Sequence, residues 1–390
     1  MELRMAKLWR RSGNKAMTGD VLKVVQLNKY YAPHRGGVET VVQDIAEGLQ
    51  DKADMNVLVC NDGQKSEDVK QGNIRLHRSG AMGKVGSMPI SLSYLKDVRR
   101  ELKAADAVLL HMPFPWGDLA LRLSGYRGKV LLWWHSDVVR QKKLLRIYKP
   151  LMRWTLKRAN RIIVATQGHI DGSAFLKPYE EKCTVIPFGV EEEYYLAGRQ
   201  MKKQDENTPV TFLFVGRMVY YKGCDVLIRA FAAMKDKSCR LDMVGQFTPL
   251  TEKCRQLAQQ LGIADRVTFE DDLSREELKR RLADCDVFVL PSILRSEAFA
   301  IVQLEALAFG KPVINTNLPS GVPYVSRNGE TGITVEPNDA AALAAAMDTL
   351  AADEALRRKY SAAAFERIEE FRMETMQQRV LKLLNEVCSD

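Results

Sequence analysis

The chain has 390 residues, of which 46% are hydrophobic and 27% charged, and a net charge of +9. This composition is typical of a globular protein and excludes a disordered or collagen-like chain. At about 100–200 residues per domain, the length predicts two or three domains. No apolar run reaches about 18 residues, so the sequence predicts no membrane-spanning helix.

The seven cysteines are odd in number and include no CxxC pair. That spacing fits neither a disulfide framework nor a zinc site, and it favours a reducing cytoplasm. The first twenty residues carry five basic side chains but no continuous apolar stretch, so they are not a secretory signal. We interpret residues 1–20 as a leader or a short amphipathic arm, with Met1 and Met17 as alternative starts.

Short apolar runs alternate with amphipathic stretches in the first half of the chain. Residues 21–31 are rich in valine and predict a strand, and the apolar residues of 38–49 recur at helical spacing. Further strands are predicted at 55–60, 74–77, 107–111, 130–135, 161–165 and 183–187, and further helices at 92–104 and 142–158. The polar, aperiodic stretch at 191–209 predicts a linker.

The alternation restarts after this linker. Strands are predicted at 210–215, 240–244, 267–269, 287–290 and 313–315, and helices at 224–234, 251–261, 276–283, 301–308, 340–351 and 354–383. Strands that alternate with helices indicate parallel sheets. The sequence therefore predicts an α/β protein with two doubly wound, Rossmann-like domains that face a central ligand cleft, beyond the carboxyl ends of the strands.

The positive charge is concentrated in one segment. Between Val138 and Ile170 there is no acidic residue, and the nine basic residues from Arg140 to Arg161 equal the whole net charge. Leucine, tyrosine and tryptophan are interleaved with them. A basic helix with such apolar residues predicts contact with an anionic membrane surface. A solvated helix whose apolar residues face its own core is one alternative, and a nucleic-acid surface is the less favoured one.

Two glutamates flank the start of a predicted helix. Glu297 lies in the loop after the strand at 287–290, and Glu305 lies within the helix that follows. The small residues Ala298 and Ala300 allow a ligand close to the backbone, and a helix N-terminus offers N–H groups to an anion. Taken singly, Glu297 is explained as a cap charge favoured by the helix dipole and Glu305 as a solvated residue.

The full segment, from Ser296 to Val313, resembles the E-x7-E element of retaining GT-B glycosyltransferases of family 4. The stretches from His135 to Pro150 and from Arg295 to Leu307 resemble bacterial members that are mannosyl- or rhamnosyltransferases. The resemblance implies that Glu297 holds hydroxyls of the donor sugar and that Glu305 binds the ribose. The family usually has glycine at the positions of Ala298 and Ala300. The further donor contacts that the resemblance implies are Phe299, Ala300 and Ile301.

A second element of the same family lies after the strand at 210–215, where Gly216, Arg217 and Lys222 precede a predicted helix. Both cations can reach an anion at the strand end, and charged hydrogen bonds of this kind are worth about 1.5–3 kcal/mol each. The resemblance implies that they hold the donor diphosphate. It also implies that the paired glycines Gly36 and Gly37 approach the diphosphate from the N-terminal domain.

His135 and Asp137 follow the predicted strand at 130–135 and match the H-x-D motif of the family, which implies a place near the donor sugar. In that role His135 positions the sugar. His111 ends another strand, although a histidine in such a place is more often structural. Asp284 and Asp286 match the D-x-D metal motif of a different glycosyltransferase fold.

These two aspartates precede a strand, whereas the metal motif follows one, so we interpret them as the entry to that strand. We therefore predict that the protein requires neither a metal nor a cofactor. The positive charge that a leaving diphosphate needs is expected from Arg217, Lys222 and helix N–H groups.

The resemblance extends from about Val21 to Leu383 and implies a complete GT-B enzyme. We expect an acceptor-side domain at 21–195, a domain that binds the nucleotide sugar at 196–365, and a final helix at 366–390 that packs back on the first domain. The implied reaction moves a hexose, with retention, from a nucleotide-diphosphate sugar to a lipid-linked saccharide in bacterial cell-surface polysaccharide synthesis. A GDP-mannose-like donor is favoured.

The expected location is the cytoplasm, peripheral on the inner face of the membrane, with no nucleic-acid partner. A nucleotide-sugar epimerase of the same fold and a non-catalytic membrane-surface protein are the alternatives. A dinucleotide oxidoreductase is disfavoured, because no G-x-G-x-x-G follows the first predicted strand.

Overall fold

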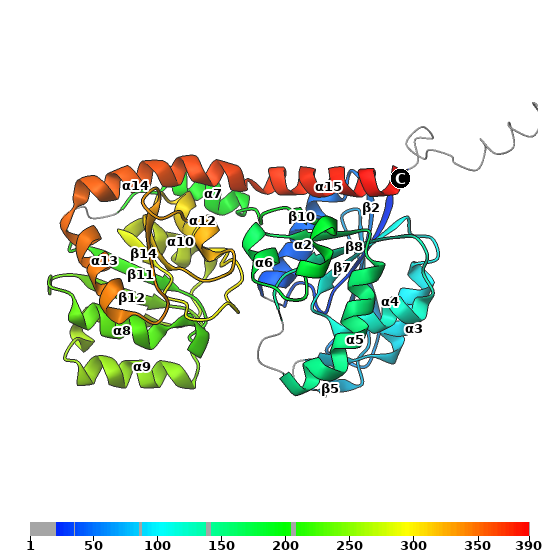
Figure 1. The fold of residues 1–390 in the computed structure, drawn as a ribbon, viewed down its shortest axis with the longest axis horizontal. Helices are drawn as coiled ribbons and strands as arrows, with labels where there is room; N and C mark the ends of the chain where they lie inside the picture. The colour runs from blue at the N-terminus through cyan, green and yellow to red at the C-terminus, as the bar shows by residue number, and fades with distance from the viewer. Residues whose placement is uncertain (1–20, 35, 86–87, 138–141, 204–207, 390) are drawn as a thin grey trace, which may run out of the picture. The chain divides into compact units, whose positions relative to one another are not determined.

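The computed structural model of the protein describes residues 21–34, 36–85, 88–137, 142–203 and 208–389 (Figure 1). The predicted leader at 1–20 lies outside these residues. The chain divides into two compact units. Unit 1 extends to Val164 and includes Tyr179–Thr184 and the segment from Gln377, whereas unit 2 comprises Ala165–Pro178 and Val185–Met376. The predicted domain ranges, 21–195 and 196–365, differ from this division and stay a prediction.

Unit 1 is built on an eight-stranded sheet with the order β10-β9-β8-β7-β1-β2-β4-β3. The strands are β1 (Lys23–Leu27), β2 (Asp54–Cys60), β3 (Glu67–Gln71), β4 (Ile74–Ser79), β7 (Ala107–Met112), β8 (Lys129–Trp134), β9 (Arg161–Val164) and β10 (Cys183–Val185). Those from β9 to β4 pair in parallel, and β3 pairs antiparallel with β4. All six residues of β7 are buried, as expected for a parallel strand covered on both faces.

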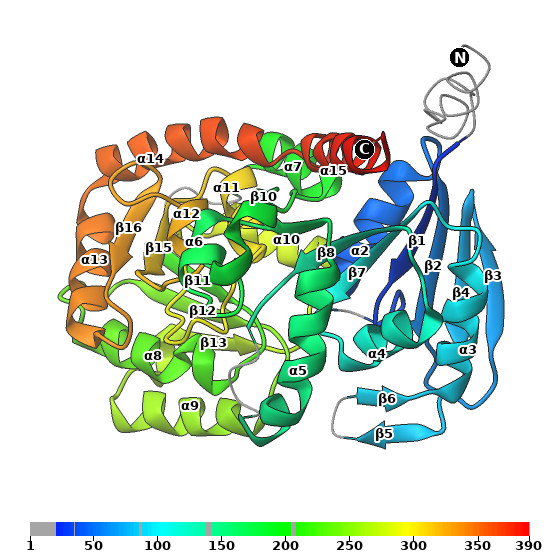
Figure 2. The same ribbon diagram turned by 45° about the vertical axis from the view of Figure 1, so that its right-hand side comes forward.

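Helices and a small hairpin complete unit 1. They are α2 (Gly37–Leu49), α3 (Leu92–Glu101), α4 (Pro115–Ser124), α5 (Lys142–Arg158), the part of α15 (Met373–Ser389) from Gln377, and the hairpin of β5 (Gly83–Val85) and β6 (Met88–Ile90). The hairpin forms a separate two-stranded sheet, apart from the large one (Figure 2). In α15 the side-chain amide of Gln377 donates to the backbone oxygen of Asp44 in α2, at 2.9 Å.

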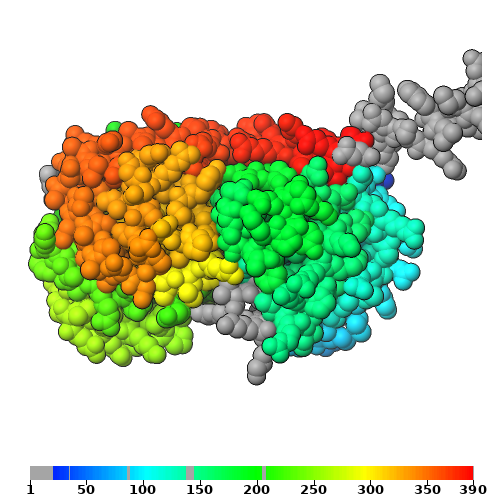
Figure 3. Space-filling model, viewed as in Figure 1, coloured from blue at the N-terminus to red at the C-terminus, as the bar shows by residue number. Residues whose placement is uncertain are grey.

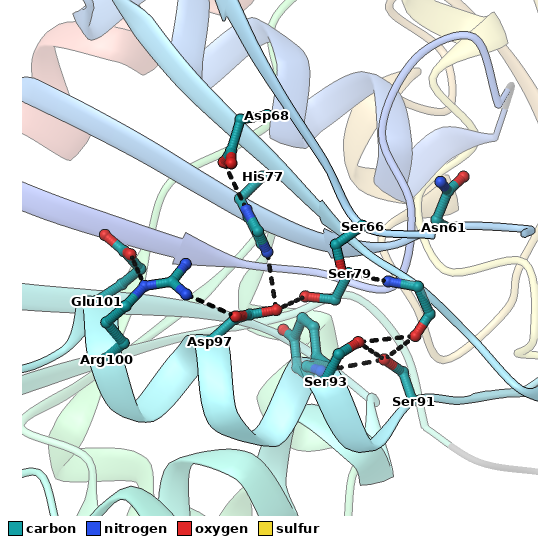
Figure 4. Close-up of polar contacts among 12 residues, drawn as sticks. Asn61, Ser66, Asp68, His77, Ser79, Ser91, Ser93, Asp97, Arg100 and Glu101 are labelled. Carbon is teal, nitrogen blue, oxygen red and sulfur yellow. Dashed lines mark hydrogen bonds and ion pairs between the residues drawn. The ribbon is translucent and has the colours of Figure 1, made fainter. Parts of the chain in front are cut away.

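The edge strand β3 is held to unit 1 by a polar cluster (Figure 4). His77 of β4 places Nδ1 2.6 Å from Asp68 of β3 and Nε2 2.8 Å from Asp97 of α3. Asp97 also accepts hydrogen bonds from the Ser79 hydroxyl at 2.7 Å and from the Arg100 guanidinium at 2.9 Å. The imidazole therefore links an exposed strand to a buried helical carboxylate.

Unit 2 is built on a six-stranded parallel sheet with the order β13-β12-β11-β14-β15-β16. The strands are β11 (Thr211–Val215), β12 (Arg240–Val244), β13 (Val267–Glu270), β14 (Val287–Val289), β15 (Val313–Thr316) and β16 (Gly332–Val335). Its helices are α6 (Gln167–Asp171), α7 (Glu192–Gln200), α8 (Cys224–Ala233), α9 (Pro249–Gln260), α10 (Arg275–Asp284), α11 (Val302–Ala308), α12 (Val322–Val325), α13 (Ala340–Ala352) and α14 (Glu354–Arg367). Phe212, Phe214 and Phe231 lie in its buried core.

Both sheets contain a point at which the strand order reverses. In unit 1 this point lies between β1 and β7, and in unit 2 it lies between β11 and β14. Loops that leave neighbouring strands in opposite directions open a crevice at such a point, and ligands of open α/β sheets bind there. The prediction of two doubly wound, Rossmann-like domains is confirmed.

Two predicted segments differ in the structure. The predicted linker at 191–209 contains α7. The helical apolar period of α7 is weak because few of its residues are apolar, yet the helix buries Tyr194 and Tyr195. A Cβ on its Gly198 would lie 2.1 Å from the Ala308 backbone oxygen, so α7 packs directly on α11. The predicted long helix at 354–383 is interrupted by a 3₁₀ turn whose apolar residues are buried.

Candidate functional site

The loops that follow β11 and β14 meet at the switch point of unit 2. Gly216 has φ of +151° and its N–H donates to the Val244 oxygen at 2.9 Å. Gly223 has φ of +68°, and a Cβ there would lie 2.1 Å from the Pro291 oxygen. The Ile293 N–H reaches back to the Tyr221 oxygen at 2.8 Å. Positive φ favours glycine at 216, and at 223 positive φ is combined with close packing against the Pro291 oxygen.

Lys222 and Glu297 face each other across these two loops. The Lys222 ammonium lies 2.6 Å from the Glu297 carboxylate, which also accepts a hydrogen bond from the Ser292 hydroxyl at 3.0 Å. Lys222 is 8% exposed and Glu297 7%. Burial disfavours the charged lysine, but the charge and hydrogen bond of Glu297 outweigh it, so the pKa of Lys222 is raised. The structure thus joins two residues that the sequence placed in separate motifs.

Arg217 precedes this pair and is exposed. Within the described part of the chain its guanidinium has no ion pair or hydrogen bond to another side chain or to the backbone. A guanidinium presents its donors in a fixed fork that matches phosphate oxygens. Arg217 is therefore accessible to an anion from solvent, in the loop that follows β11.

The backbone between Glu297 and α11 has an unusual conformation. Ala300 has φ of +61°, in the left-handed region, at one of the positions where the family usually has glycine. The Gln303 and Leu304 N–H groups donate to the Ala300 and Ile301 oxygens. In the residues that the structure describes, the N–H groups of Phe299, Ala300 and Ile301 donate to no other group. Consecutive backbone N–H groups without an internal acceptor are the kind of donors that bind an anion.

Phe299 contributes to the candidate site through its backbone alone. Its side chain is buried and makes edge-to-face contacts with Phe188 and Phe371, at centroid distances of 5.0 and 6.2 Å. The predicted donor contact at Phe299 therefore concerns the N–H group, and the ring anchors the loop.

Glu305 lies on α11 beside a charged cluster contributed by α7 and α10. Burial and the neighbouring Glu191 raise the pKa of Glu305 to about 7, Arg275 opposes this rise, and Glu193 adds to it. Arg275 itself binds both Glu191 and Glu193. Sequence reasoning missed these acidic neighbours because it assigned residues 191–209 to a linker. The tyrosine pair in that stretch was the one signal of a packed helix.

In unit 1 the predicted residues gather at the carboxyl ends of β1, β7 and β8. Gly36 and Gly37 open α2 directly after the β1 loop. The His135 N–H donates to the Met112 oxygen at 2.9 Å, and its Nε2 lies 2.8 Å from His111 Nδ1. The Trp134 indole donates to the Asp137 carboxylate at 3.2 Å. Asp137 thus has a structural partner within its own motif.

The basic segment forms α5 on the surface of unit 1 (Figure 3). Residues 138–141 lie outside the described part, and α5 side chains are described from Leu145 on. The inner face buries Tyr148, Met152, Thr155 and Leu156, and the Tyr148 hydroxyl donates to Asp118 of α4. Burial raises the pKa of Asp118 to about 7 against the opposing effect of its hydrogen bonds. The outer face exposes Arg146, Ile147, Arg153 and Lys157, with Ile147 79% exposed.

The D-x-D aspartates have structural partners. Asp286 accepts hydrogen bonds from Lys203 at 2.9 Å and from the Thr211 N–H at 2.8 Å, and Asp284 pairs with Arg280. Among the described residues, no group of three or more histidine, cysteine, aspartate or glutamate side chains is placed to hold a metal ion. No helix in the described ranges is long and apolar enough to cross a membrane.

Known proteins resemble both halves of the chain. Residues 35–194 match the family described as Glycosyltransferase Family 4, and residues 198–367 match Glycosyl transferases group 1. Over 336 residues the chain is 32% identical to the D-rhamnosyltransferase WbpZ of Pseudomonas aeruginosa, covering 84% of this chain and 86% of that protein. Over 353 residues it is 29% identical to the O-antigen chain mannosyltransferase C of Escherichia coli, covering 90% and 94%.

Solved structures show the same fold. The Anabaena protein HepE in complex with UDP-glucose superposes with a TM-score of 0.73 at 19% identity, covering 94% of this chain and 100% of that one. Fold and site together define a GT-B glycosyltransferase. The chain belongs to glycosyltransferase family 4, and the prediction of a transferase is confirmed.

Proposed function

We propose that the protein transfers a hexose, with retention of the anomeric configuration, from a nucleotide-diphosphate sugar to a lipid-linked saccharide. The observation that carries this proposal is the Lys222–Glu297 pair at the switch point of unit 2. This pair joins the loop that contains Arg217 to the loop that contains the backbone donors of Phe299, Ala300 and Ile301. Cations and backbone N–H groups stabilise a leaving diphosphate, and a carboxylate accepts hydrogen bonds from sugar hydroxyls.

In this reaction the bond between the anomeric carbon and the diphosphate oxygen breaks, and the diphosphate takes both electrons. Arg217 and Lys222 stabilise the charge that builds on it, and Glu297 holds the sugar. The acceptor hydroxyl forms the new bond on the same face, and its proton passes to the departing phosphate oxygen. Glu305 accepts the ribose hydroxyls, and His135 contacts the sugar. The charge of Arg217 and Lys222 makes a metal unnecessary in this proposal.

A GDP-mannose-like donor and an O-antigen or lipopolysaccharide type of acceptor are supported by the relatives, one of which is named an O-antigen chain mannosyltransferase. The basic, partly apolar outer face of α5 supports a peripheral position on the inner face of the cytoplasmic membrane, where a lipid-linked acceptor lies.

A thermal-shift panel with GDP, UDP, ADP, dTDP and NAD, all in EDTA, tests the donor site. A ligand at 100 times its Kd stabilises the native state by about 2.7 kcal/mol. We expect one nucleoside diphosphate to raise the melting temperature, and Arg217→Ala to remove the shift. Arg229→Ala, another exposed arginine of unit 2, is the matched control.

The protein is then incubated with lipid-linked saccharide from a membrane extract and with a sugar nucleotide that carries the same base as the stabilising nucleoside diphosphate. Labelled sugar in the lipid fraction is the expected result. A shift with NAD alone, or a full shift retained in Arg217→Ala, contradicts the proposal. A new sugar nucleotide formed without acceptor indicates an epimerase.

A further inference from the structure

Two histidines from neighbouring strands of unit 1 form a stacked, hydrogen-bonded pair. Parallel pairing of β7 and β8 sets His111 beside Trp133, two residues before His135. His111 Nδ1 lies 2.8 Å from His135 Nε2, with the ring centroids 5.1 Å apart and the planes 17° from parallel. The Trp133 ring stacks at 5.7 Å from His111. The positions of both imidazoles are therefore set by packing.

A single proton lies in the contact between the two rings, and burial decides which ring supplies it. His111 is 1% exposed, and its Nε2 is buried without a hydrogen-bond partner among the described residues. Burial lowers the pKa of His111 well below its usual value, so this ring is neutral and carries one proton. A proton on Nε2 would be a buried, unpaired N–H, which is costly.

A proton on Nδ1 instead forms the observed contact, with His111 as donor and His135 Nε2 as acceptor. We propose that His111 is a positioning residue that holds His135 in the tautomer with its proton on Nδ1. This inference rests on the proposed function, in which His135 contacts the donor sugar. In this tautomer the Nε2 lone pair of His135 accepts the hydrogen bond from His111 and does not act as a base.

Ring nitrogen NMR of the 15N-histidine-labelled protein reads the tautomer directly. The chain has five histidines, so each ring is assigned with single variants. We expect His135 to carry its proton on Nδ1 in the wild type and in His111→Asn, whose side-chain amide supplies a donor at the same place. In His111→Phe, which keeps an aromatic ring but has no donor, we expect the Nε2–H tautomer to appear.

Turnover gives the second readout. We expect kcat to fall about 10–100-fold in His111→Phe, the usual cost of removing a group that orients a functional residue, and to be largely restored in His111→Asn. His169→Phe, at a buried histidine of unit 2, controls for a general effect of replacing a buried imidazole.

A wild-type His135 that carries its proton on Nε2 overturns the inference, and so does a His111→Phe enzyme with unchanged tautomer and rate. The wild-type spectrum decides the question even if His111→Phe does not fold. The spectrum does not depend on turnover. An Nδ1–H tautomer in a protein without transferase activity therefore contradicts the proposed function alone.

Discussion

The Lys222 ammonium and the Glu297 carboxylate form a buried ion pair at 2.6 Å, although one follows β11 and the other follows β14. The two strands are neighbours in the sheet, so the pair spans the switch point of unit 2. Burial of the pair costs desolvation free energy for both charges, and their mutual attraction offsets this cost. Loss of one partner is therefore expected to affect stability as well as catalysis.

Glu297→Gln should lower kcat by at least about 100-fold, because a charged contact to the reacting sugar is lost. It should also destabilise unit 2 by about 3–5 kcal/mol, since Lys222 is left buried without its counter-charge. The double variant Lys222→Met/Glu297→Gln should recover most of this stability but none of the activity. Urea unfolding and transfer assays on the three proteins measure both effects. Equal stability of the single and double variants would show that the pair is not coupled.

Ala300→Gly should stabilise the protein or leave it unchanged. An alanine in the left-handed region costs about 1–2 kcal/mol of stability, which the change to glycine relieves. The greater conformational entropy of glycine in the unfolded chain offsets roughly 0.5–1 kcal/mol of this relief. Ala306→Gly is the matched control, because Ala306 lies inside α11 and should lose about 1 kcal/mol or more. The melting temperatures of the two variants are compared with the wild type. The idea of strain at Ala300 is abandoned if both glycines destabilise equally.

Glu305 should make nucleotide binding depend on pH. Its pKa of about 7 means that the carboxylate, the better acceptor for ribose hydroxyls, forms as pH rises through 7. Affinity for the nucleoside diphosphate should therefore increase from pH 6 to pH 8, and Glu305→Gln should flatten this rise. Titration calorimetry at several pH values measures it.

The same group affects stability with the opposite trend. Because the folded pKa of Glu305 lies above its ordinary value of 4.5, its contribution is full below pH 4.5 and is lost as pH rises through 7. Glu305→Gln should thus stabilise the protein at pH 8. An affinity profile that is identical in wild type and variant would remove Glu305 from the ribose site.

His77 should control the attachment of β3. Burial opposes the charged imidazole, but the hydrogen bonds to Asp68 and Asp97 outweigh it and raise the pKa of His77 above its usual 6.5. A histidine whose pKa is raised in the folded state stabilises that state most below pH 6.5. This contribution is lost as pH rises through the pKa of His77 in the folded protein. Amide exchange in Glu67–Gln71, corrected for its intrinsic pH dependence, should accelerate with rising pH. His77→Asn should abolish the acceleration, and protection that does not change with pH would contradict the role.

The outer face of α5 should bind anionic membranes. Changing Arg146, Arg153 and Lys157 to glutamate should release the protein from vesicles that contain phosphatidylglycerol, since each basic residue near such a surface contributes about 1 kcal/mol. The control changes Lys235, Lys253 and Lys359 of unit 2 to glutamate and has the same net charge. Cosedimentation measures both. Equal loss in the two triple variants would indicate a general charge effect, and no loss in either would leave α5 as a solvated helix.

The alternation of strands and helices, and the two short elements around Gly216–Lys222 and Glu297–Glu305, can be predicted from the sequence alone. These features are local, since a buried parallel strand needs a continuous apolar run and a tight loop needs glycine. Where the local signal was weak, the prediction was wrong. The sequence of α7 predicts a linker because few of its residues are apolar, whereas in the structure this helix packs on α11.

Which of these elements meet depends on the tertiary structure. The Lys222–Glu297 pair exists because β14 returns to lie beside β11, and the His111–His135 contact exists because β7 and β8 pair in a particular register. The pKa of Glu305 depends on acidic residues of α7 and a guanidinium of α10. Distance and burial set these interactions, and both arise from the packing of segments that are far apart in the chain.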